Sequence, residues 1–246
     1  MEKFKTLSRF LILLFVTIAI ALLAIGPVWA EEQDPYQSAI ITARTEAWRS
    51  INSGISGSAT VAIMDQGQLV YTEGFGMADR TRSVPVDADT IFNIGSISKL
   101  FCATAVMLLV DDGLMELDNP VVEYLPEFTM ADDRYRDITV RMLLDHSSGF
   151  PGSCYANMIG YQAKPDVFHD TLDNLSRTTL KHPPGEMAPY CNDGFTLAEM
   201  LVERVSGQSY IDFLSERIFQ PLSMVRTGKS LGERPKDLLA LFYAPD

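Results

Sequence analysis

The chain has 246 residues, of which 47% are hydrophobic and 21% charged, and its formal net charge is −12 at pH 7. An acidic surface of this kind favours solubility and argues against nucleic acid or an anionic membrane as a partner. The residues after the N-terminal segment suffice to bury one sizeable core, and they contain no internal repeat or low-complexity tract.

Residues 1–30 have the form of a secretory signal peptide. Three basic residues precede an apolar stretch over 10–25, and Ala30 stands directly ahead of two glutamates. We predict cleavage after Ala30, which would leave residues 31–246 as one extracytoplasmic domain. The alternative is an uncleaved anchor, the one case in which the chain would contact a membrane, but the apolar stretch is short for a span.

The hydrophobic pattern after residue 30 predicts a β-hairpin with a flanking helix, followed by a mostly helical region. β-Prone runs over 58–64 and 68–75 meet at an Asp-Gln-Gly turn, and helical spacing recurs before and after them. The predicted helices span residues 37–53, 96–113, 139–145, 197–206, with Gly207 as its C-cap, and 210–219.

The most informative segment is a Ser-x-x-Lys at the start of a long apolar run. Ser96 and Lys99 are three residues apart, which places them on one face of a helix, and only Thr104 is clearly polar between Leu100 and Val110. We therefore expect this helix to be buried on nearly all sides. Desolvation lowers the pKa of a buried lysine, so a neutral Lys99 amine beside the Ser96 hydroxyl is a candidate general base for a serine nucleophile.

Two downstream segments carry polar side chains suited to the same chemistry. Tyr190 and Asn192 follow a Pro-Pro-Gly-Glu turn and precede a helical pattern, so a phenol and a carboxamide lie on a loop that enters a helix. Between the two motifs, residues 143–150 read Leu-Leu-Asp-His-Ser-Ser-Gly-Phe, a helix end that runs into a polar turn. An isolated Ser-x-x-Lys is also the pattern of a helix-capping serine followed by a surface lysine. Three segments in this order argue against that interpretation of Ser96.

With these segments, the chain resembles the serine beta-lactamase and penicillin-binding protein superfamily, most closely its class C beta-lactamase-like branch. In that family the first motif is Ser-x-x-Lys, the second is Tyr-x-Asn, and Leu-Leu-x-His-x-Ser-Gly lies between them. The resemblance extends from about Ser58 to Leu222. It implies an α+β fold, an antiparallel sheet with flanking helices plus a helical subdomain, with the active site between them.

Carried over residue by residue, the resemblance implies that Ser96 is the acylated nucleophile and Lys99 its proton partner. Tyr190 would be the second member of the acid–base pair, and Asn192 would position the substrate amide and the Lys99 ammonium. Whether Lys99 or Tyr190 takes the first proton stays open.

His146 adjoins Asp145, which suggests a Ser-His-Asp triad. Catalytic partners usually converge from distant segments, so we interpret His146 as a residue that fastens its loop. No spacing of His, Cys and Asp residues has the form of a metal site, so we expect neither a metal nor a cofactor.

The superfamily carries a third motif, Lys or His followed by Thr or Ser and then Gly, on a strand far beyond the second. Residues 226–228 read Arg-Thr-Gly, but they come almost directly after residues 221–224, where the family has a loop. The apolar run 238–244 is followed only by Pro245-Asp246. We therefore expect a fragment of a longer protein that lacks the C-terminal strands.

Three cysteines leave at least one unpaired in an exported protein. Cys102 lies in the predicted buried helix and should be a free core thiol. Cys154 and Cys191 fall on loops that the resemblance brings near the site, so they are candidates for a disulfide, with two free thiols as the alternative.

The leading hypothesis is an extracytoplasmic serine hydrolase that forms an acyl-enzyme at Ser96. Its substrate would be a beta-lactam, a D-amino-acid peptide of cell-wall type or a small ester. The alternatives are a penicillin-binding or sensing protein that is acylated without turnover, and an inactive fragment. Deacylation separates enzyme from sensor, because only an enzyme regenerates free Ser96.

Overall fold

The computed structural model describes residues 34–153, 167–229 and 238–241. The chain divides into two compact units, and the second unit runs from Ile91 to Leu239. One unit contains an antiparallel sheet with a helix and the other is helical, which confirms the predicted α+β class. The predicted signal peptide lies outside the described residues. Among the residues that are described, no helix is long and apolar enough to cross a membrane.

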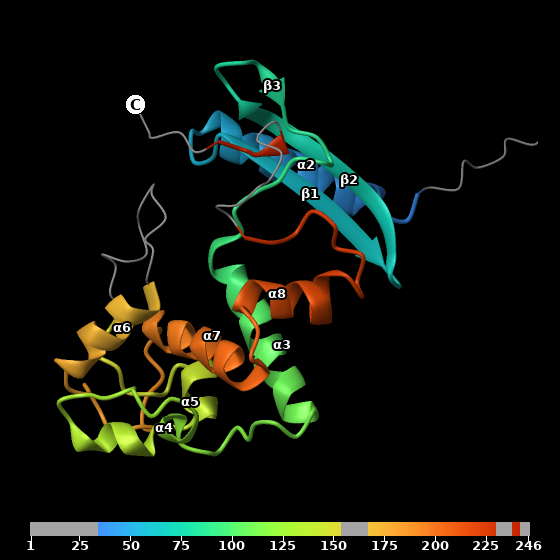
Figure 1. Cartoon of the computed structure of the whole chain (residues 1–246). Helices are drawn as coiled ribbons and strands as arrows, with labels where there is room; N and C mark the ends of the chain where they lie inside the picture. The colour runs from blue at the N-terminus through green and yellow to red at the C-terminus, as the bar shows by residue number, and fades with distance from the viewer. Residues whose placement is uncertain (1–33, 154–166, 230–237, 242–246) are drawn as a thin grey trace, which may run out of the picture. The chain divides into compact units, whose positions relative to one another are not determined.

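The first unit is a small antiparallel sheet with one long helix packed on it (Figure 1). Trp48 and Phe75 meet edge to face across this interface, with ring centroids 5.8 Å apart, and Phe75 is 1% exposed. The predicted helix and hairpin are confirmed, and a short third strand follows them. In chain order these elements are α2 (Gln37–Asn52), β1 (Ser58–Asp65), β2 (Gln68–Asp79) and β3 (Val84–Pro85), and the strands pair in the order β1-β2-β3.

The turn between β1 and β2 depends on two residues with positive φ. Gln66 has φ 46° and Gly67 has φ 77°, the combination that a two-residue hairpin turn of type I′ requires. Asp65 pairs with Gln68 directly across this turn. A tight turn of this kind fixes the register of β2 on β1.

The second unit is built around one central helix, α7, which packs against α3, α4, α5, α6 and α8 (Figure 1). Gly207 ends α7 with φ 71°, the left-handed C-cap that the sequence predicts. In chain order the unit contains η1 (Gly95–Ile97), α3 (Ser98–Asp111), α4 (Val121–Tyr124), η2 (Asp133–Asp137), α5 (Val140–Leu144), α6 (Val167–Ser176), α7 (Asp193–Ser206), α8 (Tyr210–Leu214) and the π-helical turn η4 (Ser215–Phe219).

α7 is central because it is apolar on most of its circumference. Leu197, Ala198, Leu201 and Val202 are each 0% exposed. A fully buried leucine or valine side chain contributes about 1.5–3 kcal/mol relative to an exposed one. The helix that begins at Asp193 therefore holds the unit together.

The expectation that the Ser96 helix is buried on nearly all sides is wrong for the part of the chain that is described. α3 buries Cys102, Ala105, Val106 and Leu109, while Leu100 is 68% exposed. Within its own unit α3 packs against α7 and α8, which lie side by side. The apolar residues that point away from these two helices therefore stay at the surface.

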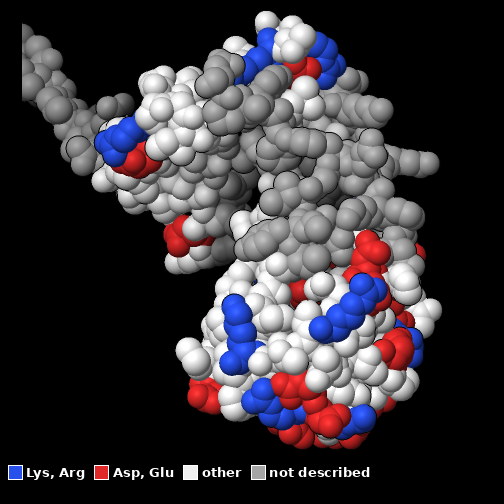
Figure 2. Space-filling view, turned by 90° about the vertical axis from the view of Figure 1, so that its left-hand side faces the viewer, with Lys and Arg blue, Asp and Glu red and all other residues white. Residues whose placement is uncertain are grey.

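Charged side chains on the second unit form exposed ion pairs. Arg141 lies 2.7 Å from Asp118, and Arg217 lies 2.7 Å from Asp112. On the face drawn in Figure 2, the basic and acidic side chains that are described are interspersed rather than gathered into fields of one sign. Exposed pairs contribute about 0–1 kcal/mol each, so apolar packing around α7 dominates the stability of this unit.

Candidate active site

Ser96 lies in the 3₁₀ turn that leads directly into α3. Asn93 Oδ1 accepts a hydrogen bond from Gly95 N at 2.8 Å, and Gly95 has φ 51°, so the chain turns sharply before the serine. One turn later, Lys99 Nζ donates to Ser96 Oγ at 3.3 Å. The predicted placement of both residues on one face is confirmed, although Lys99 is half-buried rather than buried.

Tyr190 reaches the same serine from a distant part of the chain. Its Oη lies 2.7 Å from Ser96 Oγ, and Lys99 Nζ lies 4.9 Å from the centre of its ring. Hydrogen bonding to Lys99, and then to Ser96, lowers the pKa of Tyr190 below its ordinary value. A phenol in this setting ionises more readily, so Tyr190 can accept a proton from Ser96.

His146 holds the segment that carries Tyr190. The His146 ring centroid lies 4.5 Å from that of Tyr190 and 5.2 Å from that of Phe195, and its Nδ1 accepts a hydrogen bond from Cys191 N at 3.2 Å. Burial lowers the pKa of the His146 imidazole, which favours the neutral ring that this bond needs. The interpretation of His146 as a loop-fastening residue is confirmed.

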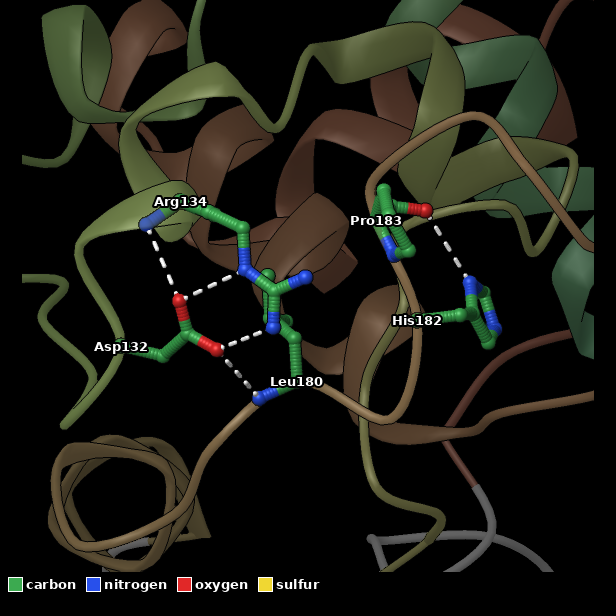
Figure 3. Close-up of polar contacts among 5 residues, drawn as sticks. All are labelled: Asp132, Arg134, Leu180, His182 and Pro183. Carbon is green, nitrogen blue, oxygen red and sulfur yellow. Dashed lines mark hydrogen bonds and ion pairs between the residues drawn. The ribbon is translucent and has the colours of Figure 1, made fainter.

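The chain that leads to Tyr190 is anchored before it reaches the site (Figure 3). Asp132 accepts hydrogen bonds from Arg134 Nη2 at 2.6 Å and from Leu180 N at 3.3 Å. The Arg134 guanidinium holds the pKa of the Asp132 carboxyl at about 2, so this carboxylate is ionised at neutral pH. The His182 Nδ1 lies 3.1 Å from Pro183 O. These contacts fix the direction in which the loop enters the site.

The polar turn between the two motifs packs against this segment. Lys181 N donates to Gly149 O at 2.9 Å, and Gly185 N donates to Ser147 O at 2.8 Å. Gly149 has φ 85°, and a Cβ at this position would lie 2.5 Å from His182 O. Only glycine fits so close an approach without strain. The turn and the segment before Tyr190 are therefore held as one piece.

Asn192 lies at the start of α7, where it is 8% exposed and bonded to Ser153. Its backbone N and its Nδ2 lie 2.8 and 3.1 Å from Ser153 Oγ. Its Oδ1 is buried and has no hydrogen-bond partner among the described residues. Within the same residues Asn192 forms no hydrogen bond with Lys99, so its role toward Lys99 stays a prediction. Ser153 carries no signal in the sequence, because nothing distinguishes it from other loop serines.

The model of the Beta-lactamase family matches residues 42–240, a range that includes all four predicted site residues. The chain belongs to the Beta-lactamase family. Among curated proteins, Penicillin-binding protein 4* of Bacillus subtilis (strain 168) is 33% identical over 175 residues, which are 69% of this chain and 37% of that protein. The resemblance to the serine beta-lactamase and penicillin-binding protein superfamily is therefore confirmed.

Solved structures of Beta-lactamase family relatives have the same fold. The octameric penicillin-binding protein homologue from Pyrococcus abyssi gives a TM-score of 0.70 at 28% identity, covering 84% of this chain and 48% of that chain. A class C beta lactamase from Rhodobacter sphaeroides gives a TM-score of 0.59 at 27% identity, and the match covers 74% of this chain and 49% of that chain. The chain thus spans less than half the length of each of these relatives.

The remaining sequence predictions concern residues around this Beta-lactamase family site. Residues 226–228 lie in a turn and not on a strand, as expected for a loop. Cys191 is buried, with Sγ 3.5 Å from Gly152 O, and it forms no disulfide with a described residue. Cys154 lies outside the described residues, so their pairing stays a prediction. In the described part of the chain, no three His, Cys, Asp or Glu side chains are placed to hold a metal ion.

Proposed function

We propose that the protein is an exported serine hydrolase that forms an acyl-enzyme at Ser96. One observation carries the proposal: Ser96 Oγ lies 2.7 Å from Tyr190 Oη and 3.3 Å from Lys99 Nζ. A serine hydroxyl is a weak nucleophile until a neighbouring group takes its proton, and two such groups are within hydrogen-bond reach. Membership of the Beta-lactamase family supports this interpretation of Ser96, Lys99 and Tyr190.

In the acylation step, Ser96 Oγ forms a bond to the carbonyl carbon of the substrate while its proton passes to the Tyr190 phenolate. The scissile bond then breaks, and Tyr190 gives the proton to the leaving amine or alcohol. Deacylation repeats the sequence with water as the nucleophile. The lowered pKa of Tyr190 supports Tyr190 rather than Lys99 as the first base.

The proposed substrate is a beta-lactam, a D-amino-acid peptide of cell-wall type or a small ester. The beta-lactam is supported by relatives that are a penicillin-binding protein and a class C beta lactamase. The small ester is a candidate because the same acylation step cleaves an ester. Export is supported by the signal-peptide pattern of residues 1–30, and it would bring the site to extracytoplasmic peptides.

A penicillin-binding protein that is acylated without turnover is the second candidate. It is favoured by the similarity to Penicillin-binding protein 4* of Bacillus subtilis. The two candidates share the acylation step and differ in deacylation. After a short exposure to benzylpenicillin and removal of the excess, an enzyme regains free Ser96 over time, whereas a non-turnover protein stays acylated.

Labelling with a fluorophosphonate probe tests the nucleophile. The probe should label Ser96, and Ser96→Ala should abolish labelling because, among the described residues, only the Ser96 hydroxyl is hydrogen-bonded to both Tyr190 and Lys99. Ser98→Ala is the matched control, since Ser98 is an exposed serine in the same motif and should leave labelling unchanged. Unchanged labelling in Ser96→Ala, or loss of labelling in Ser98→Ala, would reject the assignment.

A further inference from the structure

The start of α7 is bonded to the chain that follows the polar turn. Asn192 N and Nδ2 donate to Ser153 Oγ at 2.8 and 3.1 Å, across a separation of 39 residues in the sequence. Beside this pair, Cys191 Sγ lies 3.5 Å from Gly152 O. The proposed chemistry assigns no role to Ser153, although its hydroxyl holds a predicted site residue.

The side chain of Asn192 is not used by its own helix. Asn192 is the N-cap of α7, yet its side chain makes no capping hydrogen bond. An asparagine at this position ordinarily accepts a hydrogen bond from an amide of the first turn. Here Phe195 N and Thr196 N donate to the backbone oxygen of Asn192 instead, at 2.9 and 3.1 Å. The orientation of the carboxamide must therefore be set by a contact outside α7.

Ser153 provides that contact. In the described part of the chain, its bond to Nδ2 is the one hydrogen bond of the Asn192 carboxamide. A carboxamide has a donor end and an acceptor end, which exchange places when the terminal torsion turns by half a rotation. Because Ser153 Oγ accepts from both nitrogens of Asn192, the nitrogen end is held toward Ser153 and the oxygen is left at the other end.

The oxygen end of Asn192 lacks a donor. Oδ1 is buried without a hydrogen-bond partner among the described residues, and Asn192 as a whole is 8% exposed. A buried acceptor that stays unpaired is rare in native proteins and destabilises the fold. Lys99 Nζ is already engaged with Ser96 Oγ. An amide N–H of a bound substrate is a donor that matches this oxygen.

We propose that Ser153 is a positioning residue for Asn192. Its hydroxyl holds the nitrogen end of the carboxamide, so that Oδ1 is the end that accepts a hydrogen bond from an amide N–H of the substrate. Ser153 does not touch the reacting atoms and acts through Asn192. The consequence for substrates rests on the proposed function, whereas the orientation of the carboxamide does not.

The orientation can be measured without a substrate. In protein labelled with ¹⁵N at asparagine, the Nδ2 resonance of Asn192 is assigned by its loss in Asn192→Ala. One proton of this group should exchange slowly with solvent in the parent, because it is bonded to Ser153. Ser153→Ala should speed its exchange about tenfold or more, and Ser153→Thr, which keeps the hydroxyl, should restore slow exchange.

Two reagents that react with Ser96 test the consequence for substrates. Benzylpenicillin carries an amide N–H next to its beta-lactam ring, whereas diisopropyl fluorophosphate carries no N–H. Ser153→Ala should slow the reaction with benzylpenicillin about tenfold and change that with diisopropyl fluorophosphate by less than about twofold. Ser153→Thr should stay within about threefold of the parent with both reagents. A merely structural role of Ser153 would slow both reactions equally.

A matched control and a double variant complete the test. Ser206 is a half-buried serine at the other end of α7, where its Oγ accepts from Gln208 N at 3.2 Å, so Ser206→Ala should match the parent with both reagents. Ser153→Ala added to Asn192→Ala should cause no further loss with benzylpenicillin, because the group that Ser153 positions has been removed.

The outcomes separate the two proposals. Unchanged Nδ2 exchange in Ser153→Ala, equal losses with the two reagents, or additive losses in the double variant overturns the role of Ser153 and leaves the serine hydrolase proposal standing if Ser96 is labelled. Faster exchange in Ser153→Ala, together with no modification of Ser96 by either reagent in the parent, supports the positioning of Asn192 and overturns the proposed function.

Discussion

At the scale of single residues, the proposed chemistry depends most on the phenol of Tyr190. Tyr190→Phe removes the hydroxyl but keeps the ring that contacts His146 and Lys99. Acylation of Ser96 should slow by about 10²–10⁴-fold, the usual contribution of a positioned acid–base group. Stopped-flow or gel-based labelling rates measure the change.

The pH dependence of acylation tests whether the Tyr190 phenolate is the base. Acylation by the parent should rise as pH increases through the pKa of Tyr190, which lies below the ordinary value for a phenol, because the phenolate is the proton acceptor. This rise should be absent in Tyr190→Phe. The control is Tyr36→Phe in the first unit, which should keep the parent profile. A parent-like rate and profile in Tyr190→Phe would exclude Tyr190 as the base.

Residues whose types and spacing carry chemistry could be predicted, and residues defined by packing could not. Ser96, Lys99 and Tyr190 belong to ordered motifs, and the structure brings their side chains together. Ser153 carries no such signal. Its place at the site depends on which loop meets the start of α7, and this is a property of the tertiary packing.

At the scale of elements, the contact between the polar turn and the segment before Tyr190 can be tested by Gly149→Ala. A Cβ would lie 2.5 Å from His182 O in addition to the strain of φ 85°. Gly113→Ala is the control, since it has a similar φ of 71° and nothing within 4 Å of the added Cβ. Gly149→Ala should therefore destabilise the protein by about 1–3 kcal/mol more than Gly113→Ala. Equal losses in urea unfolding would show that the close approach does not exist.

The anchor at Asp132 predicts a specific loss of stability in acid. Its pKa is about 2 in the folded protein, below the ordinary value of an aspartate, because Arg134 and the backbone of Leu180 favour the carboxylate. A lowered folded pKa stabilises the protein above the unfolded value, and that contribution is lost as pH falls from about 4 toward 2.

The measurement is the free energy of unfolding of the parent and of Asp132→Asn across this range. The two curves should differ at neutral pH and converge as the parent carboxyl is protonated. Asp133→Asn makes the same charge change at the neighbouring residue and should follow the parent. A constant gap between parent and Asp132→Asn down to about pH 2 would contradict the account.

Elements with strong periodic patterns could be predicted closely, and those that depend on neighbours could not. α2, the hairpin and the C-cap of α7 follow from local spacing and turn residues. α7 begins at Asp193, four residues before its predicted start, because Asp193, Gly194 and Phe195 are buried by contacts that local sequence does not report. α6 was not predicted, although Phe168, Thr171, Leu172 and Leu175 have helical spacing.

At the scale of the whole molecule, the states of the three cysteines test the proposed export, because disulfides form in extracytoplasmic proteins. Cys102 is 1% exposed and burial raises its pKa, so it should resist alkylation in the folded protein and react after unfolding. If Cys154 and Cys191 are bridged, peptide mapping of exported protein without reductant should yield one linked pair, worth about 2–4 kcal/mol. Alkylation of all three cysteines in unfolded, unreduced protein would reject the bridge.

The proposed function depends on an acyl-enzyme at Ser96. The most direct measurement is mass spectrometry of the protein after incubation with benzylpenicillin, followed by peptide mapping of the adduct. We expect one added benzylpenicilloyl group per chain, carried on Ser96 and absent from Ser96→Ala. An adduct on another residue, or an unmodified Ser96 in folded protein at saturating benzylpenicillin together with no fluorophosphonate labelling, would contradict it.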